Sequence, residues 1–201
     1  MKFKPLAIIL LLIVVAVAVY FVFLGTKNQE KKIKALENEI EFLKEEQVPI
    51  RYKIISQEND EIEVSVKFYD LDGKEIAKER FKMPGTVASF DFYVVKMANK
   101  YIAFPTKIFT DKIEPKNGTS LYSFYENEGF PMIFYSESSG KLFNEGIKAL
   151  YEKLKSGDLE NIENIFGNMV QNAPQTIANG VEGTVFKIVV HTKGGIELIE
   201  E

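Results

Sequence analysis

The fold is decided by residues 62–73, whose sequence is IEVSVKFYDLDG. Apolar and polar residues alternate through 62–68, and this period of two is typical of a strand with one buried and one wet face. Asp70–Gly73 follows as a turn, in which Gly73 can adopt positive φ without strain. The stretch therefore predicts a strand and the turn that leads into its antiparallel partner.

Similar patterns extend the sheet in both directions. A strand over 50–57 precedes this stretch, and strands over 74–82 and 86–96 follow it. Tyr101 begins a further strand that Pro105 is expected to interrupt, because proline cannot donate a hydrogen bond to the ladder. Together these segments predict an antiparallel meander.

Two amphipathic helices are predicted after these strands. The first has an apolar stripe made of Phe143, Ile147, Leu150, Tyr151 and Leu154. Gly157-Asp158 suits the end of this helix and the start of the second. The second stripe consists of Leu159, Ile162, Ile165 and Phe166. Residues 168–183 are predicted to form a loop, and 184–190 and 196–199 flank a Gly-rich turn as a closing hairpin.

Residues 64–76, VSVKFYDLDGKEI, lie ahead of Pro84-Gly85. The stretch Val64–Gly85 resembles the hairpin of FxLYD-type and related Ig-like β-sandwich domains of bacterial envelope proteins. Those families are generally non-catalytic, and the resemblance implies the same here. The helical pattern at 142–166 departs from their all-β structure, so the resemblance does not cover the whole domain.

The segment Leu6–Leu24 contains no charge, Pro or Gly. As a helix it spans about 28 Å at 1.5 Å per residue, which is close to the thickness of a bilayer core. We expect an uncleaved, single-pass signal anchor that contacts membrane lipid. A cleaved signal peptide is the alternative, since Ala16-Val17-Ala18 has the form of a cleavage site.

The anchor is predicted to place the C-terminal domain outside the cytoplasm, in the cell membrane of an envelope. Lys2 and Lys4 precede the segment as in a signal anchor. The lysines that follow it favour the opposite orientation by the positive-inside rule: Lys27, Lys31, Lys32 and Lys34.

The segment after the anchor is predicted to be a helical stalk that ends at Pro49. Four apolar residues follow the a/d spacing of a short parallel coiled coil, and they form a candidate dimer seam: Ile33, Leu36, Ile40 and Leu43. The alternatives are a solvated helix and a helix packed on its own domain.

The predicted fold class is α+β: an N-terminal transmembrane helix and short helical stalk, then a mainly antiparallel β domain with two amphipathic helices and a C-terminal β hairpin. The expected divisions are a membrane anchor at 1–25, a stalk at 26–47 and a soluble domain at 48–201.

Composition excludes several kinds of chemistry. The chain has no Cys, one His and a net charge of −4, and the domain has no basic cluster in its sequence, so thiol chemistry, zinc and nucleic-acid binding are not expected. His191 is interpreted as an exposed structural residue. Asp70 and Asp72 fit a turn better than a calcium loop. We predict no catalytic residue, no metal site and no cofactor.

Asp91 lies between two phenylalanines, on the face of its strand opposite to theirs. We expect it on a wet face; the alternative is a buried acid with a Tyr or Lys partner. Asn117-Gly118-Thr119 is a glycosylation triplet, a pattern that is common by chance.

Aromatic residues are concentrated between Phe81 and Tyr135. They indicate either core filling in a chain without Trp or an interaction surface for a peptide, glycan or protein. The candidate surface residues are Tyr122, Phe124, Tyr125 and Phe130.

These observations predict a non-catalytic, membrane-anchored envelope protein that acts as a scaffold or binding module. Its expected partner is an envelope protein or glycan, with self-association through the stalk. A carboxylate-dependent hydrolase of envelope glycans is the first alternative, and it requires two acids facing one cleft. A small-molecule or lipid-binding domain is the second, and it requires an enclosed apolar cavity.

Overall fold

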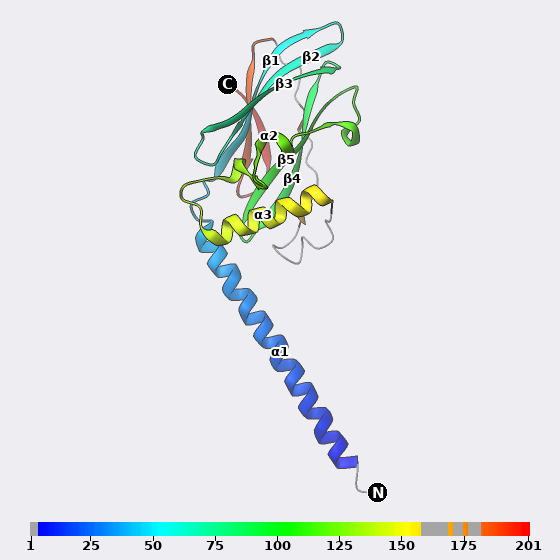
Figure 1. The fold of residues 1–201 in the computed structure, drawn as a ribbon, viewed down its shortest axis with the longest axis vertical. Coiled ribbons are helices and arrows are strands. Elements are labelled where there is room, and N and C mark those ends of the chain that lie inside the picture. The colour runs from blue at the N-terminus through cyan, green and yellow to red at the C-terminus, as the bar shows by residue number, and fades with distance from the viewer. Residues whose placement is uncertain (1–3, 158–168, 171–174, 177–181) are drawn as a thin grey trace. The chain divides into compact units, whose positions relative to one another are not determined.

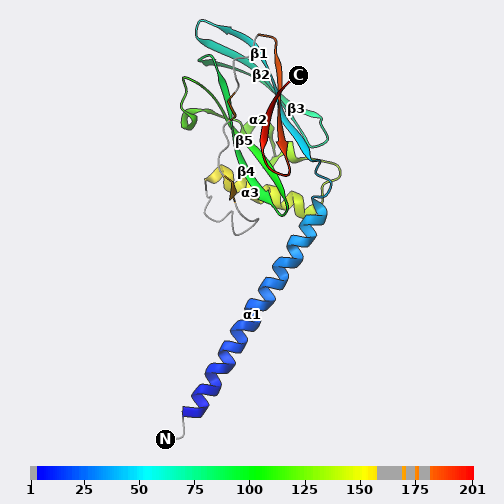
Figure 2. The same cartoon turned by 180° about the vertical axis from the view of Figure 1, so that it is seen from behind.

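The computed structural model describes residues 4–157, 169–170, 175–176 and 182–201. The chain divides into two compact units, Met1–Asn38 and Glu39–Glu201. The first consists of most of the helix α1 (Lys4–Glu39). The second contains the β strands, which Figures 1 and 2 show from opposite sides.

The first sheet of the second unit has five strands in the order β12-β11-β1-β2-β3, and all neighbours are antiparallel. Their bounds are β1 (Glu46–Glu58), β2 (Glu61–Tyr69), β3 (Glu75–Pro84), β11 (Val185–His191) and β12 (Ile196–Glu200). The C-terminal hairpin thus pairs with β1, and β3 lies at an edge of the sheet.

The second sheet is built on the long hairpin of β4 (Ala88–Met97) and β5 (Lys100–Thr110). Three short strands complete it: β6 (Thr119–Ser120), β9 (Met169–Val170) and β10 (Gln175–Thr176). The short elements between β5 and α3 (Lys141–Ser156) are η1 (Pro115–Asn117), α2 (Tyr122–Tyr125), β7 (Glu126–Asn127), β8 (Phe130–Pro131) and η2 (Met132–Phe134).

The core lies on both faces of the second sheet. On one face, the Phe90 ring of β4 is 5.4 Å from the Tyr52 ring of β1, which joins the two sheets. On the other face, Phe104 of β5 lies opposite Tyr93 and contacts Tyr151 of α3 at 6.2 Å between ring centroids. Figures 1 and 2 show α3 against β4 and β5. Strand β4 is therefore buried on both sides.

Several expectations for the strands are confirmed, with two differences. The predicted strands around 50–57, 62–68, 74–82 and 86–96 are present, but they belong to two sheets and not to one meander. Pro105 does not interrupt its strand. Pro105 pairs with Phe92 and Lys107 with Asp91, so a β-bulge accommodates the proline and β5 continues.

The predicted transmembrane helix is contradicted. Among the described residues, no helix combines the length and the apolar character needed to cross a membrane. Residues 6–24 belong to one continuous helix, α1, whose second half is rich in Lys and Glu. The side chains described within 6–24 are Val15, Val17, Val19 and Tyr20. The predicted fold class with a membrane anchor is therefore wrong, and so is the predicted single-pass extracytoplasmic placement. The second unit consists mainly of antiparallel β sheet.

The predicted coiled coil is also wrong. Helix α1 ends at Glu39, well before Pro49, so the seam does not continue along one helix. Ile40 and Leu43 are 0% and 3% exposed in the core of the second unit, whereas Ile33 is 50% exposed. The physical reason is that burial in the domain core removes more apolar surface from water than a two-heptad seam does.

The first predicted amphipathic helix is confirmed as α3, which ends at Ser156 and is capped by Gly157 with φ 75°. Two further predictions concern 158–183. The predicted second helix over 159–166 lies outside the described residues. Within the predicted loop, β9 and β10 both pair with β4.

Candidate binding groove

The β2–β3 turn is held by the side chain of Asp70. Its buried carboxylate accepts hydrogen bonds from the backbone N–H groups of Asp72 and Lys74, at 3.1 and 2.8 Å. This is the geometry of an Asx turn. The turn interpretation of Asp70 and Asp72 is thus confirmed. Across the described residues, no group of three or more His, Asp or Glu side chains could hold a metal ion.

The same turn is tied to the segment that follows η2. The Leu71 N–H donates to the carbonyl oxygen of Tyr135 at 3.1 Å. The Ser136 hydroxyl and the Glu137 N–H donate to the Asp72 carboxylate at 3.0 and 3.1 Å. These contacts bring Tyr135 next to the start of β3.

A groove of about 360 Å³ lies between the start of β3 and the α2–η2 segment. Its apolar and aromatic lining comes from Ile76, Phe124, Tyr125, Met132 and Tyr135. Tyr135 is 43% exposed, an unusual value for so large a ring. The groove is open and has charged residues at its margins, so its shape suits a side chain of a partner rather than an enclosed small molecule.

The predicted aromatic surface is partly core and partly groove. Tyr125 is buried and donates its hydroxyl hydrogen bond to the Pro105 carbonyl oxygen at 2.7 Å. Phe124 packs against Phe81 at 5.3 Å between ring centroids and still lines the groove. Burial raises the pKa of the Tyr125 hydroxyl well above its ordinary value, so the side chain stays neutral.

The other two predicted surface residues do not line the groove. The Tyr122 ring contacts Tyr151 of α3 at 5.5 Å, and Phe130 is half-buried in β8. Sequence reasoning missed Ile76, Met132 and Tyr135. Tyr135 could have been included because it lies in the same aromatic-rich stretch, whereas Ile76 is brought there only by the turn at Asp70.

The carboxylates of Glu75 and Glu126, at the margins of the groove, already have partners within the chain. Glu126 accepts hydrogen bonds from Lys155 and, at 3.0 Å, from the Tyr151 hydroxyl. The hydrogen bond from Lys155 lowers the pKa of the Glu126 carboxyl. Glu75 binds Lys67 at 2.6 Å. Glu126 therefore does not have the raised pKa of a general acid, and the Glu75 carboxylate is occupied by Lys67.

The groove adjoins an edge of the first sheet with which no described strand pairs. Strand β3 is the last strand of the first sheet, and its residues 78–80 are exposed. A strand at an edge presents unpaired backbone N–H and C=O groups along its outer side. Glu75 and Ile76, the first residues of β3, are part of the groove lining. Within the part of the chain that the structure describes, the groove and the unpaired edge of β3 thus meet in one place.

Asp91 is buried, so its expected position on a wet face is wrong. The physical reason is that both faces of β4 are covered. This agrees with the alternative of a buried acid: the Thr106 hydroxyl lies 3.0 Å from Asp91 Oδ2, and the charge of Lys107, its partner in register on β5, also favours the carboxylate. Burial raises the pKa of the Asp91 carboxyl, and the hydrogen bond from Thr106 partly opposes this shift.

The remaining candidates lie elsewhere. His191 ends β11 with its side chain 31% exposed, and its Nε2 lies 3.2 Å from Glu197 Oε2. Asn117 is exposed in η1. The chain matches no protein-family model, no curated protein and no solved structure. The resemblance of Val64–Gly85 to the FxLYD-type hairpin therefore stays a prediction.

Proposed function

We propose that unit Glu39–Glu201 is a non-catalytic peptide-binding module. Its ligand is an extended segment of a partner protein, which pairs with the outer edge of β3 and places an apolar side chain in the groove. The observation that carries this proposal is that Ile76 belongs both to the edge strand and to the groove. Strand addition supplies affinity through the backbone, and a side-chain pocket supplies selectivity.

The dimensions support a peptide ligand. Side chains of an added strand point alternately to the two faces of the sheet. Those on the inner face continue the surface of Phe124, which also packs on Phe68 at 6.4 Å between ring centroids. An apolar side chain of the partner would lie between Phe124 and Tyr135. It would extend the stack toward Tyr135 and remove both of these rings from water.

Catalysis has less support in this groove. A carboxylate-dependent hydrolase needs an acid with a raised pKa beside its substrate. Lys155 lowers the pKa of Glu126, and Asp91, whose pKa burial raises, is not part of the groove lining. A small-molecule or lipid site needs an enclosed apolar cavity, whereas this groove is open and has charged margins.

The test selects ligands from a phage-displayed library of random peptides as long as β3, 10 residues, against the full chain. Enriched peptides are then synthesised, and their affinity is measured by fluorescence anisotropy. We expect micromolar binding, which Tyr135→Ala weakens about tenfold through loss of the apolar contact. Leu142→Ala is the matched control, because Leu142 is 42% exposed and lies outside the groove.

A second measurement tests the backbone pairing. N-methylation of alternate residues in a selected peptide removes the N–H groups on one of its edges only. Strand pairing predicts that one set of methylated positions abolishes binding and the other set does not. The proposal is wrong if no peptide is enriched, if Tyr135→Ala binds as tightly as the parent chain, or if both methylated sets bind equally.

A further inference from the structure

We propose that the segment pairing with β3 carries acidic residues at every second position, on the outward face of the sheet. This inference rests on the proposed function and names the chemistry of its ligand: an extended peptide with alternating Asp or Glu. The charges on the outer face of the first sheet favour such a ligand.

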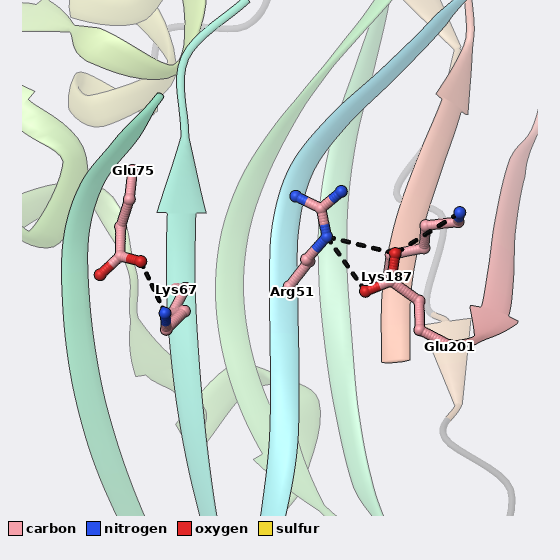
Figure 3. Close-up of polar contacts among 5 residues, drawn as sticks. All are labelled: Arg51, Lys67, Glu75, Lys187 and Glu201. Carbon is pink, nitrogen blue, oxygen red and sulfur yellow. Dashed lines mark hydrogen bonds and ion pairs between the residues drawn. The ribbon is translucent and has the colours of Figure 1, made fainter. Parts of the chain in front are cut away.

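Four basic side chains form one row across this face. Lys187 pairs in register with Arg51, Arg51 with Lys67, and Lys67 with Lys78. Adjacent strands are about 4.8 Å apart, so the row crosses β11, β1, β2 and β3 in steps of that length. Figure 3 shows the first three of these cations beside their carboxylate partners. We call these four residues the basic row.

Neutralisation of the basic row is incomplete at its β3 end. Glu201 lies 3.1 Å from Arg51 and 3.5 Å from Lys187, and Glu75 lies 2.6 Å from Lys67. For Lys78, the structure shows no ion pair with any described residue. Among the described ion pairs, Lys78 at the β3 edge is therefore the one member of the basic row without a carboxylate partner.

Arg80, two residues further along β3, is a second exposed cation, and it is only weakly paired. Its side chain is 66% exposed, and its ion pair with Glu63 is long, at 3.6 Å. Because side chains two residues apart on a strand share a face, Lys78 and Arg80 project on the same side of the sheet. A strand added to β3 would meet both cations with residues that are themselves two positions apart.

Cross-strand electrostatics then selects the ligand. A basic residue opposite Lys78 would lengthen a row of like charges and destabilise the pairing, whereas a carboxylate would complete it. The same charges disfavour a second copy of this chain: antiparallel pairing of two β3 strands about Glu79 would set Lys78 opposite Arg80. The edge therefore discourages self-pairing and favours an acidic partner.

The first experiment reads the composition of the peptides selected by the full chain. We expect Asp or Glu enriched at positions i and i+2, with apolar residues between them. Selected peptides without this enrichment would overturn the inference. Affinity for an acidic peptide should also fall as ionic strength rises, because exposed charges are screened.

The second experiment reverses the charges of the chain. The double variant Lys78→Glu/Arg80→Glu should bind a selected acidic peptide about tenfold more weakly, and should bind better when lysines replace the acidic residues of the peptide. Lys53→Glu is the matched control, since Lys53 is exposed on the same face, in β1, and the described residues offer it no ion pair. Its affinity should stay within about twofold.

The outcomes separate this inference from the proposed function. If Tyr135→Ala weakens binding but the double variant binds as the parent chain does, the acidic specificity is wrong and the peptide-binding function stands. If the library yields no ligand at all, the proposed function itself falls. Circular dichroism and thermal unfolding of each variant exclude a loss of fold as the cause.

Discussion

The Thr106 hydroxyl lies 3.0 Å from Asp91 Oδ2 and 3.1 Å from the Asp91 carbonyl oxygen, across the bulge that lets Pro105 remain within β5. This contact satisfies a buried acid in the middle of the domain. It also makes the charge of Asp91 a determinant of stability.

Asp91→Asn should make the domain more stable at neutral pH. Burial raises the folded-state pKa above the ordinary value of 3.8, so the folded state holds this proton more tightly than the unfolded state. The contribution of Asp91 to the free energy of unfolding therefore falls as pH rises from 3.8 through the folded-state pKa, and is constant above it. Asparagine keeps an oxygen for Thr106 and carries no charge. Urea denaturation should show a larger gain at about pH 7 than at about pH 3. Equal gains at both values would contradict this prediction.

Tyr125→Phe should lower the free energy of unfolding by about 1–3 kcal/mol, because it leaves the buried Pro105 carbonyl oxygen without its hydrogen bond. Tyr135→Phe is the control, since Tyr135 is 43% exposed and lines the groove. Chemical denaturation of the two variants measures the difference. Similar midpoints for both would show that the Tyr125 bond does not stabilise the bulge.

Ile40→Ala should destabilise the domain by about 2–5 kcal/mol, because Ile40 is 0% exposed and its truncation leaves a cavity. Ile33→Ala should change stability by less than about 0.5 kcal/mol, because Ile33 is 50% exposed. The two residues are one heptad apart, so a coiled-coil seam would give both substitutions the same effect on self-association. Thermal unfolding combined with analytical ultracentrifugation distinguishes these cases.

Gly140→Ala and Glu39→Ala should show strong coupling. Glu39 Oε2 accepts a hydrogen bond from the Phe143 N–H at 2.8 Å, which caps the first turn of α3. A Cβ at Gly140 would collide with the Glu39 side chain. We expect Glu39→Ala to cost about 1 kcal/mol, and Gly140→Ala to cost less in that background than in the parent chain. Additive effects in a double-mutant cycle would contradict this account.

Local patterns predicted the strands well, because the period of two in 62–68 and the turn chemistry of Asp70–Gly73 are local properties. The packing of elements that are distant in sequence cannot be predicted from such local patterns. The phenylalanines on either side of Asp91 identify one apolar face of β4, but nothing local reveals that α3 covers the other. For the same reason the a/d spacing predicts that Ile40 lies in a helical seam, although it lies in the core.

The groove was partly predictable. The aromatic-rich stretch pointed to Phe124 and Tyr125, whereas Ile76 and the basic row depend on the pairing of strands distant in sequence. Lys187 and Arg51 are far apart along the chain, and only the insertion of β1 between β11 and β2 makes them neighbours. The net charge of −4 and the lack of a basic cluster in the sequence conceal this local row.

The end of α1 has a practical consequence for anyone who shortens this protein. Residues Glu39, Ile40 and Leu43 precede the first strand, yet they cap α3 and fill the interior. A recombinant fragment that starts at Val48 would lack part of its hydrophobic core and would be prone to aggregate. A fragment for crystallisation or NMR should begin no later than Glu39.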